Sequence, residues 1–163
     1  MLKDCKIVKA EPYDAEEILN LYGTHLGGPA GWSREYPNKD TVNFDLQRNA
    51  LFVMKNSQNE IIATITIDSD DVVENLECWS KTLVPSAELS RLCVREDMKN
   101  KGIARMMMEH TFSYLKDKGY KSVHILVRTG HIVALKSYSH LNNKKVGECH
   151  MFGNNYHCFE KEL

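Results

Sequence analysis

The sequence predicts a mixed α/β fold, in which strands and helices build a single domain over residues 1–163. Three observations predict it. Short segments in the first half alternate apolar with polar residues, which is typical of a meander of strands. In the second half, strand-like runs alternate with segments of helical periodicity, which favours strand–helix units. A chain of 163 residues has the usual size of one domain, and no Pro/Gly-rich linker divides it.

Composition indicates an ordinary globular protein. The net charge is −1, with 42% hydrophobic and 26% charged residues, so no global field favours nucleic acid or a membrane surface. The five cysteines are scattered and form no C-x-x-C pair, which argues against a disulfide framework and against a metal site. We expect no signal peptide in residues 1–9, and no apolar run reaches the ~18 residues that a membrane helix needs. These features predict a soluble, cytoplasmic protein.

In the first half, apolar residues recur at helical spacing after Pro12, and Asp14 stands where it can cap the helix that they predict. A glycine-rich loop over residues 23–31 follows. A second helix is predicted over residues 40–49, and Asp40 is expected to cap it. Residues 68–74 are predicted to form an acidic turn. Strands are predicted over residues 5–9, 51–54 and 61–68, the last two as a hairpin.

The second half is predicted to run as strand, helix, strand, helix and two closing strands. The longer helix covers residues 102–118, with Met106 and Met107 on its apolar line and Gly119 as a left-handed terminator. The dense apolar strand that follows is typical of a sheet covered on both faces. The remaining predicted segments are strands over residues 87–95, 121–127, 145–149 and 156–160, and a helix over residues 131–140.

The loop before the longer helix could bind a phosphate. A helix N-terminus exposes unpaired amides and about half a positive charge, which attracts anions. Gly102 lets a ligand approach the backbone closely, and Asn100 tolerates a left-handed conformation. By itself the segment is equally consistent with a polar connection whose basic residues are solvated. It has neither the Gly-Lys-Ser/Thr of a Walker loop nor the three glycines of a dinucleotide fingerprint.

The run Lys99-Asn100-Lys101-Gly102-Ile103-Ala104 fits the form Q/R-x-x-G-x-G/A, the phosphate loop of the GNAT superfamily of N-acetyltransferases, which this sequence resembles. Four other segments are also similar, in the right order: the opening segment (3–22), the strand before the loop (88–94), the segment that matches the N-x-x-A-x-x-x-Y helix (127–138) and the next strand (144–148). The resemblance covers nearly the whole chain. It implies one N-acetyltransferase domain, with a mixed, mostly antiparallel sheet of about seven strands flanked by about four helices.

Three positions depart from the family pattern. Lys99 replaces the more frequent Arg or Gln, which keeps the charge but loses forked hydrogen bonding. His131 replaces the usual Asn at the start of its helix, so a cofactor hydrogen bond there is less secure. Asn142-Asn143 stands where Gly-Phe is common, which alters a turn and an aromatic contact. None of these changes removes a cradle made of backbone amides.

The resemblance further implies that acetyl-CoA is the cosubstrate, and that a primary amine attacks the thioester directly within a ternary complex. The backbone of the fourth strand would hold the pantetheine arm, and the loop would hold the pyrophosphate. The implied cofactor-binding residues are Leu92, Cys93, Val94, Lys99, Asn100, Lys101, Gly102, Ile103, Ala104, Arg105, His131 and Ala134.

Two residues are the candidates for proton transfer. Tyr138 matches the family's tyrosine that protonates the coenzyme A sulfur, and its alternative role is to pack its ring under the sheet with the hydroxyl on a backbone group. Glu88 is the expected base, directly or through a water, against the alternatives of a solvated strand-edge carboxylate or a partner for Arg91. Glu77 and His124 are weaker alternatives for the base, His124 being expected as a hydrogen-bonded core residue. Cys93 lies inside an apolar strand, which favours a buried hydrophobe over a covalent nucleophile.

The acceptor is less well specified. Trp32 and Tyr36 follow the glycine-rich loop, where the family builds its acceptor pocket; they could line that pocket or anchor the loop to the sheet. The partner is thus a small-molecule or peptide amine, with a homodimer left open. Two other functions stay open: a non-catalytic acyl-CoA-binding or sensing module on the same fold, and an α/β nucleotide-binding protein whose loop holds another phosphate ligand.

Overall fold

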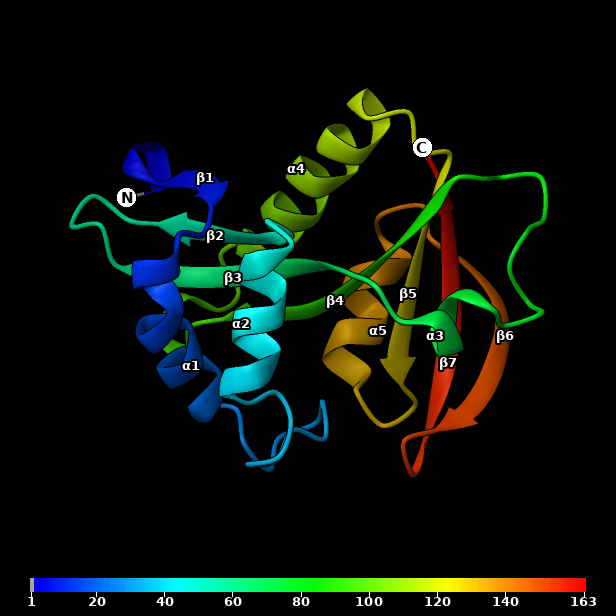
Figure 1. Cartoon of the computed structure of the whole chain (residues 1–163), viewed down its shortest axis with the longest axis horizontal. Coiled ribbons are helices and arrows are strands. Elements are labelled where there is room, and N and C mark those ends of the chain that lie inside the picture. The colour runs from blue at the N-terminus through cyan, green and yellow to red at the C-terminus, as the bar shows by residue number, and fades with distance from the viewer. Residues whose placement is uncertain (1) are drawn as a thin grey trace. The chain divides into compact units, whose positions relative to one another are not determined.

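The computed structural model describes residues 2–163 and shows a mixed α/β architecture, as the sequence predicts (Figure 1). Its seven strands follow the order β1-β2-β3-β4-β5-β7-β6 in one mostly antiparallel sheet. The strands are β1 (Lys6–Lys9), β2 (Leu51–Lys55), β3 (Ile61–Asp68), β4 (Ser86–Val94), β5 (Ser122–Arg128), β6 (Lys144–Met151) and β7 (Asn154–Glu162). The α-helices are α1 (Ala15–Gly23), α2 (Lys39–Gln47), α3 (Asp71–Glu74), α4 (Ile103–Asp117) and α5 (Ile132–Ser139).

The chain forms two compact units. Unit 1 runs to Ile67 and resumes over Arg91–His110, and unit 2 comprises Asp68–Ser90 and Thr111–Leu163. The chain therefore crosses between the units at three places: at the last residue of β3, inside β4 and inside α4.

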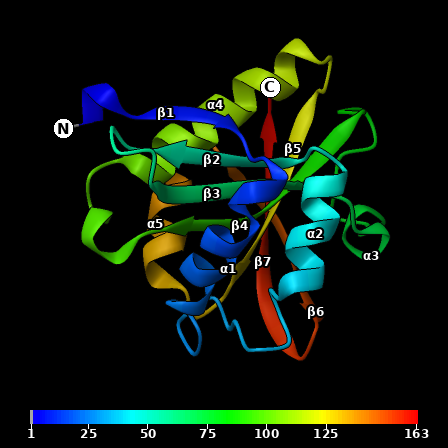
Figure 2. The ribbon, with the colours of Figure 1, turned by 60° about the vertical axis from the view of Figure 1, so that its left-hand side comes forward.

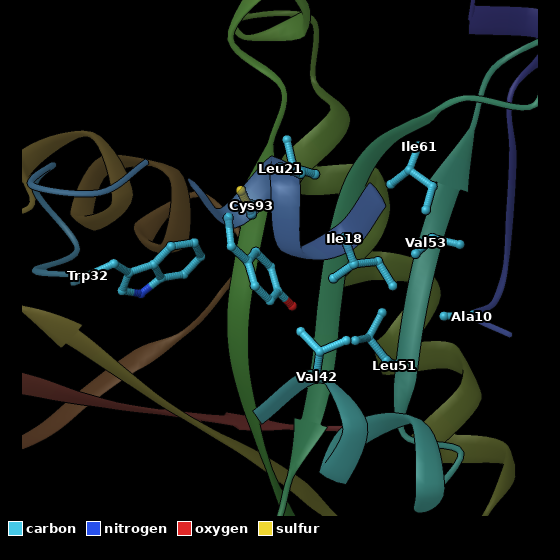
Figure 3. Packing of buried hydrophobic residues seen from close by; sticks show 10 residues of the cluster. Ala10, Ile18, Leu21, Trp32, Val42, Leu51, Val53, Ile61 and Cys93 are labelled. Atoms are coloured by element: carbon cyan, nitrogen blue, oxygen red, sulfur yellow. The ribbon is translucent and has the colours of Figure 1, made fainter. Parts of the chain in front are cut away.

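Unit 1 is built on the antiparallel pairs β1–β2 and β2–β3. Figure 2 shows α1 and α2 side by side in front of these strands. Ile18 of α1 and Val42 of α2 are buried against Leu51 and Val53 of β2, as Figure 3 shows. The apolar face that predicted the first helix is thus the face that it buries, and burial of such side chains contributes about 1.5–3 kcal/mol each.

Unit 2 carries the antiparallel pairs β5–β7 and β6–β7, together with the parallel start of β4 beside β5. A small apolar cluster joins α3 to these strands through Val73, Trp79 and Cys158. The Trp79 indole N–H donates to the Val73 carbonyl at 2.7 Å, so the buried ring has its polar atom satisfied. The segment between α3 and β4 is therefore packed onto β7 rather than left as an open loop.

Three predictions on local structure were wrong. Asp14 does not cap α1: its carboxylate accepts from the Glu11 N–H at 2.9 Å and from Lys55 Nζ at 2.7 Å, a partner distant in sequence. Asp40 does not cap α2, because the cap is Asn38, whose side chain accepts a hydrogen bond from the Thr41 N–H at 3.0 Å. The acidic turn over residues 68–74 contains the one-turn helix α3.

A fourth correction concerns α4. Met106 was predicted on the apolar line of this helix but is exposed, and its neighbours Met107 and Met108 are buried.

A buried ion pair links α2 to β4 within unit 1. Asp45 is fully buried and accepts from Arg91 Nε at 2.9 Å and from Arg91 Nη2 at 2.8 Å. Thr66 Oγ1 and Arg48 Nη2 also donate to this carboxylate, at 3.2 and 3.0 Å. Arg91 itself has a φ of +49°, which is strained for a residue with a side chain. The bidentate contact of Arg91 with Asp45 therefore stabilises the left-handed conformation of Arg91 in β4.

Asp45→Ala is expected to lower the free energy of unfolding by about 3–5 kcal/mol, because it leaves the Arg91 guanidinium buried without its carboxylate. Urea unfolding followed by circular dichroism measures the loss. The control is Asp97→Ala, which removes an exposed partner of Arg95 in the same unit and should barely move the midpoint. Equal, small shifts in the two variants would contradict this role for Asp45.

Candidate active site

The connection between β4 and α4 has the geometry of an anion-binding loop. A short 3-10 turn over Glu96–Met98 leads into Lys99, and two left-handed residues follow, Asn100 with a φ of +59° and Gly102 with a φ of +78°. The helix then begins at Ile103, with no acidic residue in its first turn. A Cβ built on Gly102 would meet no atom within 4 Å. The space beside this backbone is thus open, and a phosphate could approach the amides of the helix start.

The basic side chains of this loop already have partners. Lys99 Nζ pairs with the Glu96 carboxylate, and Lys101 Nζ donates to the Asp97 carbonyl at 3.0 Å. Arg105 Nε donates to Glu109 Oε1 at 2.8 Å, one turn further along α4. The positive charge is therefore partly neutralised in place, and the backbone amides are the main feature of the loop that fits a phosphate.

The end of β4, which precedes this loop, carries Leu92, Cys93 and Val94. Cys93 is buried, while its two neighbours are partly covered. Burial raises the pKa of the Cys93 thiol to about 12, so the group stays protonated near neutral pH and is a poor nucleophile. The structure thus favours the prediction of a buried hydrophobe at this position.

A histidine that the sequence reasoning missed lies against Cys93. His25 follows α1, and its Nδ1 is 3.4 Å from Cys93 Sγ and 3.2 Å from the Leu21 carbonyl oxygen. The Thr24 hydroxyl donates to the same carbonyl at 2.7 Å, so its oxygen can only accept from His25 Nδ1, 2.9 Å away. The tautomer of His25 is therefore protonated on Nδ1. Its position in a glycine-rich loop was the only signal in the sequence.

The two aromatic residues proposed for the acceptor pocket both make anchoring contacts. Trp32 is buried in the core of unit 1 (Figure 3). Its ring is edge-on to that of Tyr22, with a centroid distance of 5.2 Å. Tyr36 is exposed, but its hydroxyl accepts from Arg91 Nη1 at 2.7 Å. These contacts favour the anchoring alternative for Trp32, and they join Tyr36 to the left-handed turn of β4.

In unit 2, the structure places the expected base inside the protein. Glu88 is buried, so the alternative of a solvated strand-edge carboxylate is wrong. It stands in register with His124 of β5. His124 is also buried and lies 2.9 Å from Glu160 Oε2 through its Nε2, which makes it the hydrogen-bonded core residue that the sequence predicts. Glu77, the remaining weaker alternative, is exposed.

Helix α5 carries the other predicted residues of unit 2. His131 caps the helix, since its Nδ1 accepts from the Ala134 N–H at 3.4 Å. His131 is thus the N-cap of α5. Tyr138 has a partly covered ring, and desolvation of its hydroxyl raises the pKa of this phenol to about 12. Among the described residues, none hydrogen-bonds to that hydroxyl, so the alternative in which it rests on a backbone group finds no support.

Within residues 2–163, no group of three or more His, Cys, Asp or Glu side chains is arranged to hold a metal ion. None of the helices described is long and apolar enough to cross a membrane.

This sheet has the fold of solved N-acetyltransferases, and the acetyltransferase family model that matches the chain makes it an acyltransferase. The chain belongs to the GNAT acetyltransferase family, whose model matches residues 15–142 and so runs through both units. No curated protein sequence is significantly similar to the chain.

Solved structures give the same fold at low sequence identity. A GCN5-related N-acetyltransferase from Kribbella flavida matches with a TM-score of 0.78 and 13% identity, covering 100% of both chains. A ribosomal-protein-alanine N-acetyltransferase from Brucella melitensis matches with a TM-score of 0.77 and 14% identity, over 97% of this chain and 99% of that chain. The putative acetyltransferase yncA from Salmonella typhimurium, solved with acetyl-CoA, matches with a TM-score of 0.75 and 14% identity, over 98% of this chain and 94% of that chain.

Proposed function

We propose that the chain transfers the acetyl group of acetyl-CoA to a primary amine by direct attack within a ternary complex, as a single N-acetyltransferase domain. The observation that carries this proposal is the pair of left-handed residues Asn100 and Gly102 before α4, with open space beside Gly102. Amides at a helix start can bind the pyrophosphate of coenzyme A without a side chain. The structural neighbour solved with acetyl-CoA supports the choice of cosubstrate.

Two groups of residues are proposed to hold the cosubstrate. The loop over residues 99–105 binds the pyrophosphate, mainly through backbone amides, because its basic side chains are already paired. The backbone of Leu92, Cys93 and Val94 holds the pantetheine arm. His131 and Ala134, at the start of α5, are the remaining proposed cofactor-binding residues. The His131 ring already accepts a hydrogen bond from the Ala134 N–H.

The proton transfers are assigned to Glu88 and Tyr138. The Glu88 carboxylate takes a proton from the ammonium form of the acceptor, and the freed amine attacks the thioester carbonyl carbon. The nitrogen of the tetrahedral intermediate still carries a surplus proton. As the C–S bond breaks, the electron pair leaves with sulfur, and Tyr138 gives its hydroxyl proton to this sulfur while it takes the surplus proton from the nitrogen. Since burial raises its pKa, the phenol remains protonated at every working pH and is always available as a donor.

The acceptor is proposed to be a primary amine on a peptide or a small molecule. The Brucella neighbour is described as acting on a ribosomal-protein alanine, and a further neighbour is the NatC complex bound to a Gag peptide and CoA. Both descriptions favour a peptide or protein amine as the first acceptor to test. We also propose a cytoplasmic location, which the five free cysteines support.

The test is release of free coenzyme A across a panel of amines that contains peptides with different N-terminal residues, a lysine peptide, polyamines, amino acids and aminoglycosides. The proposal predicts amine-dependent thiol release with at least one acceptor. Tight acetyl-CoA binding with no turnover across the panel would instead favour a non-catalytic sensing module. Binding of ATP or NAD in place of acetyl-CoA would contradict the donor itself.

Lys99→Ala is expected to weaken acetyl-CoA binding by less than about tenfold, because Lys99 is exposed and already paired with Glu96. Isothermal titration calorimetry measures the dissociation constant. Lys116→Ala, which removes a lysine from the far end of α4, controls for a general loss of positive charge. A loss of several hundredfold in Lys99→Ala alone would show that the side chain, and not the backbone, holds the phosphates.

A further inference from the structure

Three ionisable side chains of unit 2 form one row across its strands. Glu88 of β4 is in parallel register with His124 of β5, and His124 is in antiparallel register with Glu160 of β7. Residues directly opposite on neighbouring strands project from the same face of a sheet. All three are buried, with 5%, 2% and 7% of their surface exposed. Such groups are rarely buried without a structural or chemical reason.

The contacts of Glu160 fix where His124 carries its proton. Glu160 Oε2 accepts from the Ser80 N–H at 3.0 Å and lies 2.9 Å from His124 Nε2. An ionised carboxylate can only accept, so His124 Nε2 is the donor. The Trp79 ring is stacked on the imidazole, with centroids 4.0 Å apart and planes 9° apart, which holds its orientation. The lone pair of the neutral ring is therefore on Nδ1.

This Nδ1 is buried and has no hydrogen-bond partner among the described residues. A buried acceptor without a partner is destabilising, and each one in a native structure calls for an explanation. The two nitrogens of an imidazole point to opposite sides of the ring. Because Nε2 faces Glu160 on β7, Nδ1 faces the other neighbour of β5, which is β4 with Glu88 in register. Because Nδ1 has no direct hydrogen-bond partner among the described residues, a proton would reach it from the in-register Glu88 through one water.

The row also stands where the pairing of β4 with β5 ends. Their register covers Ser86–Glu88 with Ser122–His124, so Glu88 and His124 form its last pair. The charged groups next to His124 in register are Glu88 and Glu160; Lys144 of β6 is in register with Glu160, and its side chain is exposed.

We propose that His124 and Glu160 form a proton-accepting pair behind Glu88, so that the acceptor's proton moves from the Glu88 carboxyl group to His124 Nδ1. The inference rests on the proposed function, since it needs Glu88 as the base. In the step, Glu88 returns to a carboxylate, and His124 becomes an imidazolium whose Nε2–H still donates to the Glu160 carboxylate. His124 is a positioning and proton-holding residue here, and the proton leaves to water after the acetylated amine has dissociated.

The protonation state of His124 fits this role. Burial lowers the pKa of the imidazole, against an opposing contribution from Glu160. The ring is therefore neutral near neutral pH and can accept a proton. Because the folded-state pKa lies below its ordinary value, the unfolded chain binds the proton more strongly, and stability falls as the pH drops below about 6.5.

The test compares His124→Gln, Glu88→Gln and the double variant, with His157→Gln on β7 as the matched control. We expect His124→Gln to lower kcat about 10- to 100-fold with unchanged affinity for acetyl-CoA, and to shift the acidic limb of the pH profile of kcat. The double variant should lose little more than Glu88→Gln alone, because both residues act in one step. Multiplicative losses, or a wild-type kcat and profile in His124→Gln, would overturn the inference.

A second measurement needs no activity. Nitrogen-15 NMR of the histidine rings is expected to show His124 protonated on Nε2 and unprotonated on Nδ1 at neutral pH. Glu160→Gln should change this signal, whereas His157→Gln should not. The opposite tautomer would overturn the inference even if no acceptor is known. Absence of turnover in the unsubstituted protein, with this tautomer present, would count against the proposed function and not against the pair.

Discussion

Gly102→Val is expected to weaken acetyl-CoA binding about 100-fold, which corresponds to about 2.7 kcal/mol. Gly102 has a φ of +78°, and a Cβ there would project into space that no protein atom within 4 Å occupies. That open space is where a phosphate would meet the amides at the start of α4. A branched side chain therefore blocks the ligand and also strains the turn, and calorimetry with acetyl-CoA measures the loss.

Gly119→Val separates these two effects. Gly119 follows α4 and has a φ of +88°, and a Cβ at this position would likewise meet no atom within 4 Å. Both variants should lose stability through the left-handed backbone, by roughly 1–2 kcal/mol or more for a branched residue. Only Gly102→Val should lose affinity for acetyl-CoA. Normal binding by Gly102→Val, or equal weakening in the two variants, would refute the assignment of the loop.

Tyr138→Phe is expected to lower kcat about 100-fold while leaving the dissociation constant of acetyl-CoA unchanged. The phenol has a pKa raised to about 12 by burial, well above the ~8.5 of an ordinary thiol. Its hydroxyl is thus better suited to stabilise the charge that develops on sulfur through a hydrogen bond than to surrender the proton early. The loss in kcat should therefore be the same from about pH 6 to about pH 9, because Tyr138 does not titrate in that range.

Tyr156→Phe is the matched control for this variant. Tyr156 is a second tyrosine of unit 2 whose pKa is raised by burial, and it lies on β7 with no assigned role. Steady-state kinetics with a saturating amine should show wild-type kcat for Tyr156→Phe. If Tyr138→Phe turns over at the wild-type rate, or if its loss follows a basic limb in the pH profile, the role given to this hydroxyl is wrong.

Much of the fold could be predicted from local sequence. Apolar periodicity located α1, α4 and the strands, and Gly102 with Asn100 marked the left-handed loop that the structure contains. Helix starts were less predictable where a tertiary partner competes: Asp14 binds Lys55 of β2 in place of capping α1. Propensity is a weak guide at such positions, because a buried ion pair outweighs it.

Candidate site residues could be proposed from sequence where a short motif resembles the family's, but not where distant strands meet. The resemblance suggested the phosphate loop and Tyr138, and their roles stay predictions. The row from Glu88 to Glu160 depends on the register of three strands, which no local pattern specifies. The left-handed Arg91 was equally hidden, since its conformation depends on the Asp45 carboxylate from α2.

Acetyl-CoA is proposed to give its acetyl group directly to an amine, without an acetyl-enzyme, and this is the central claim. Intact-protein mass spectrometry during a single turnover tests it most directly. The enzyme is first mixed with acetyl-CoA alone, and then with the amine. We expect an unmodified protein throughout, with free coenzyme A and acetylated amine appearing together only after the amine is added. An acetylated protein that forms before the amine is added, and disappears on adding it, would contradict direct transfer.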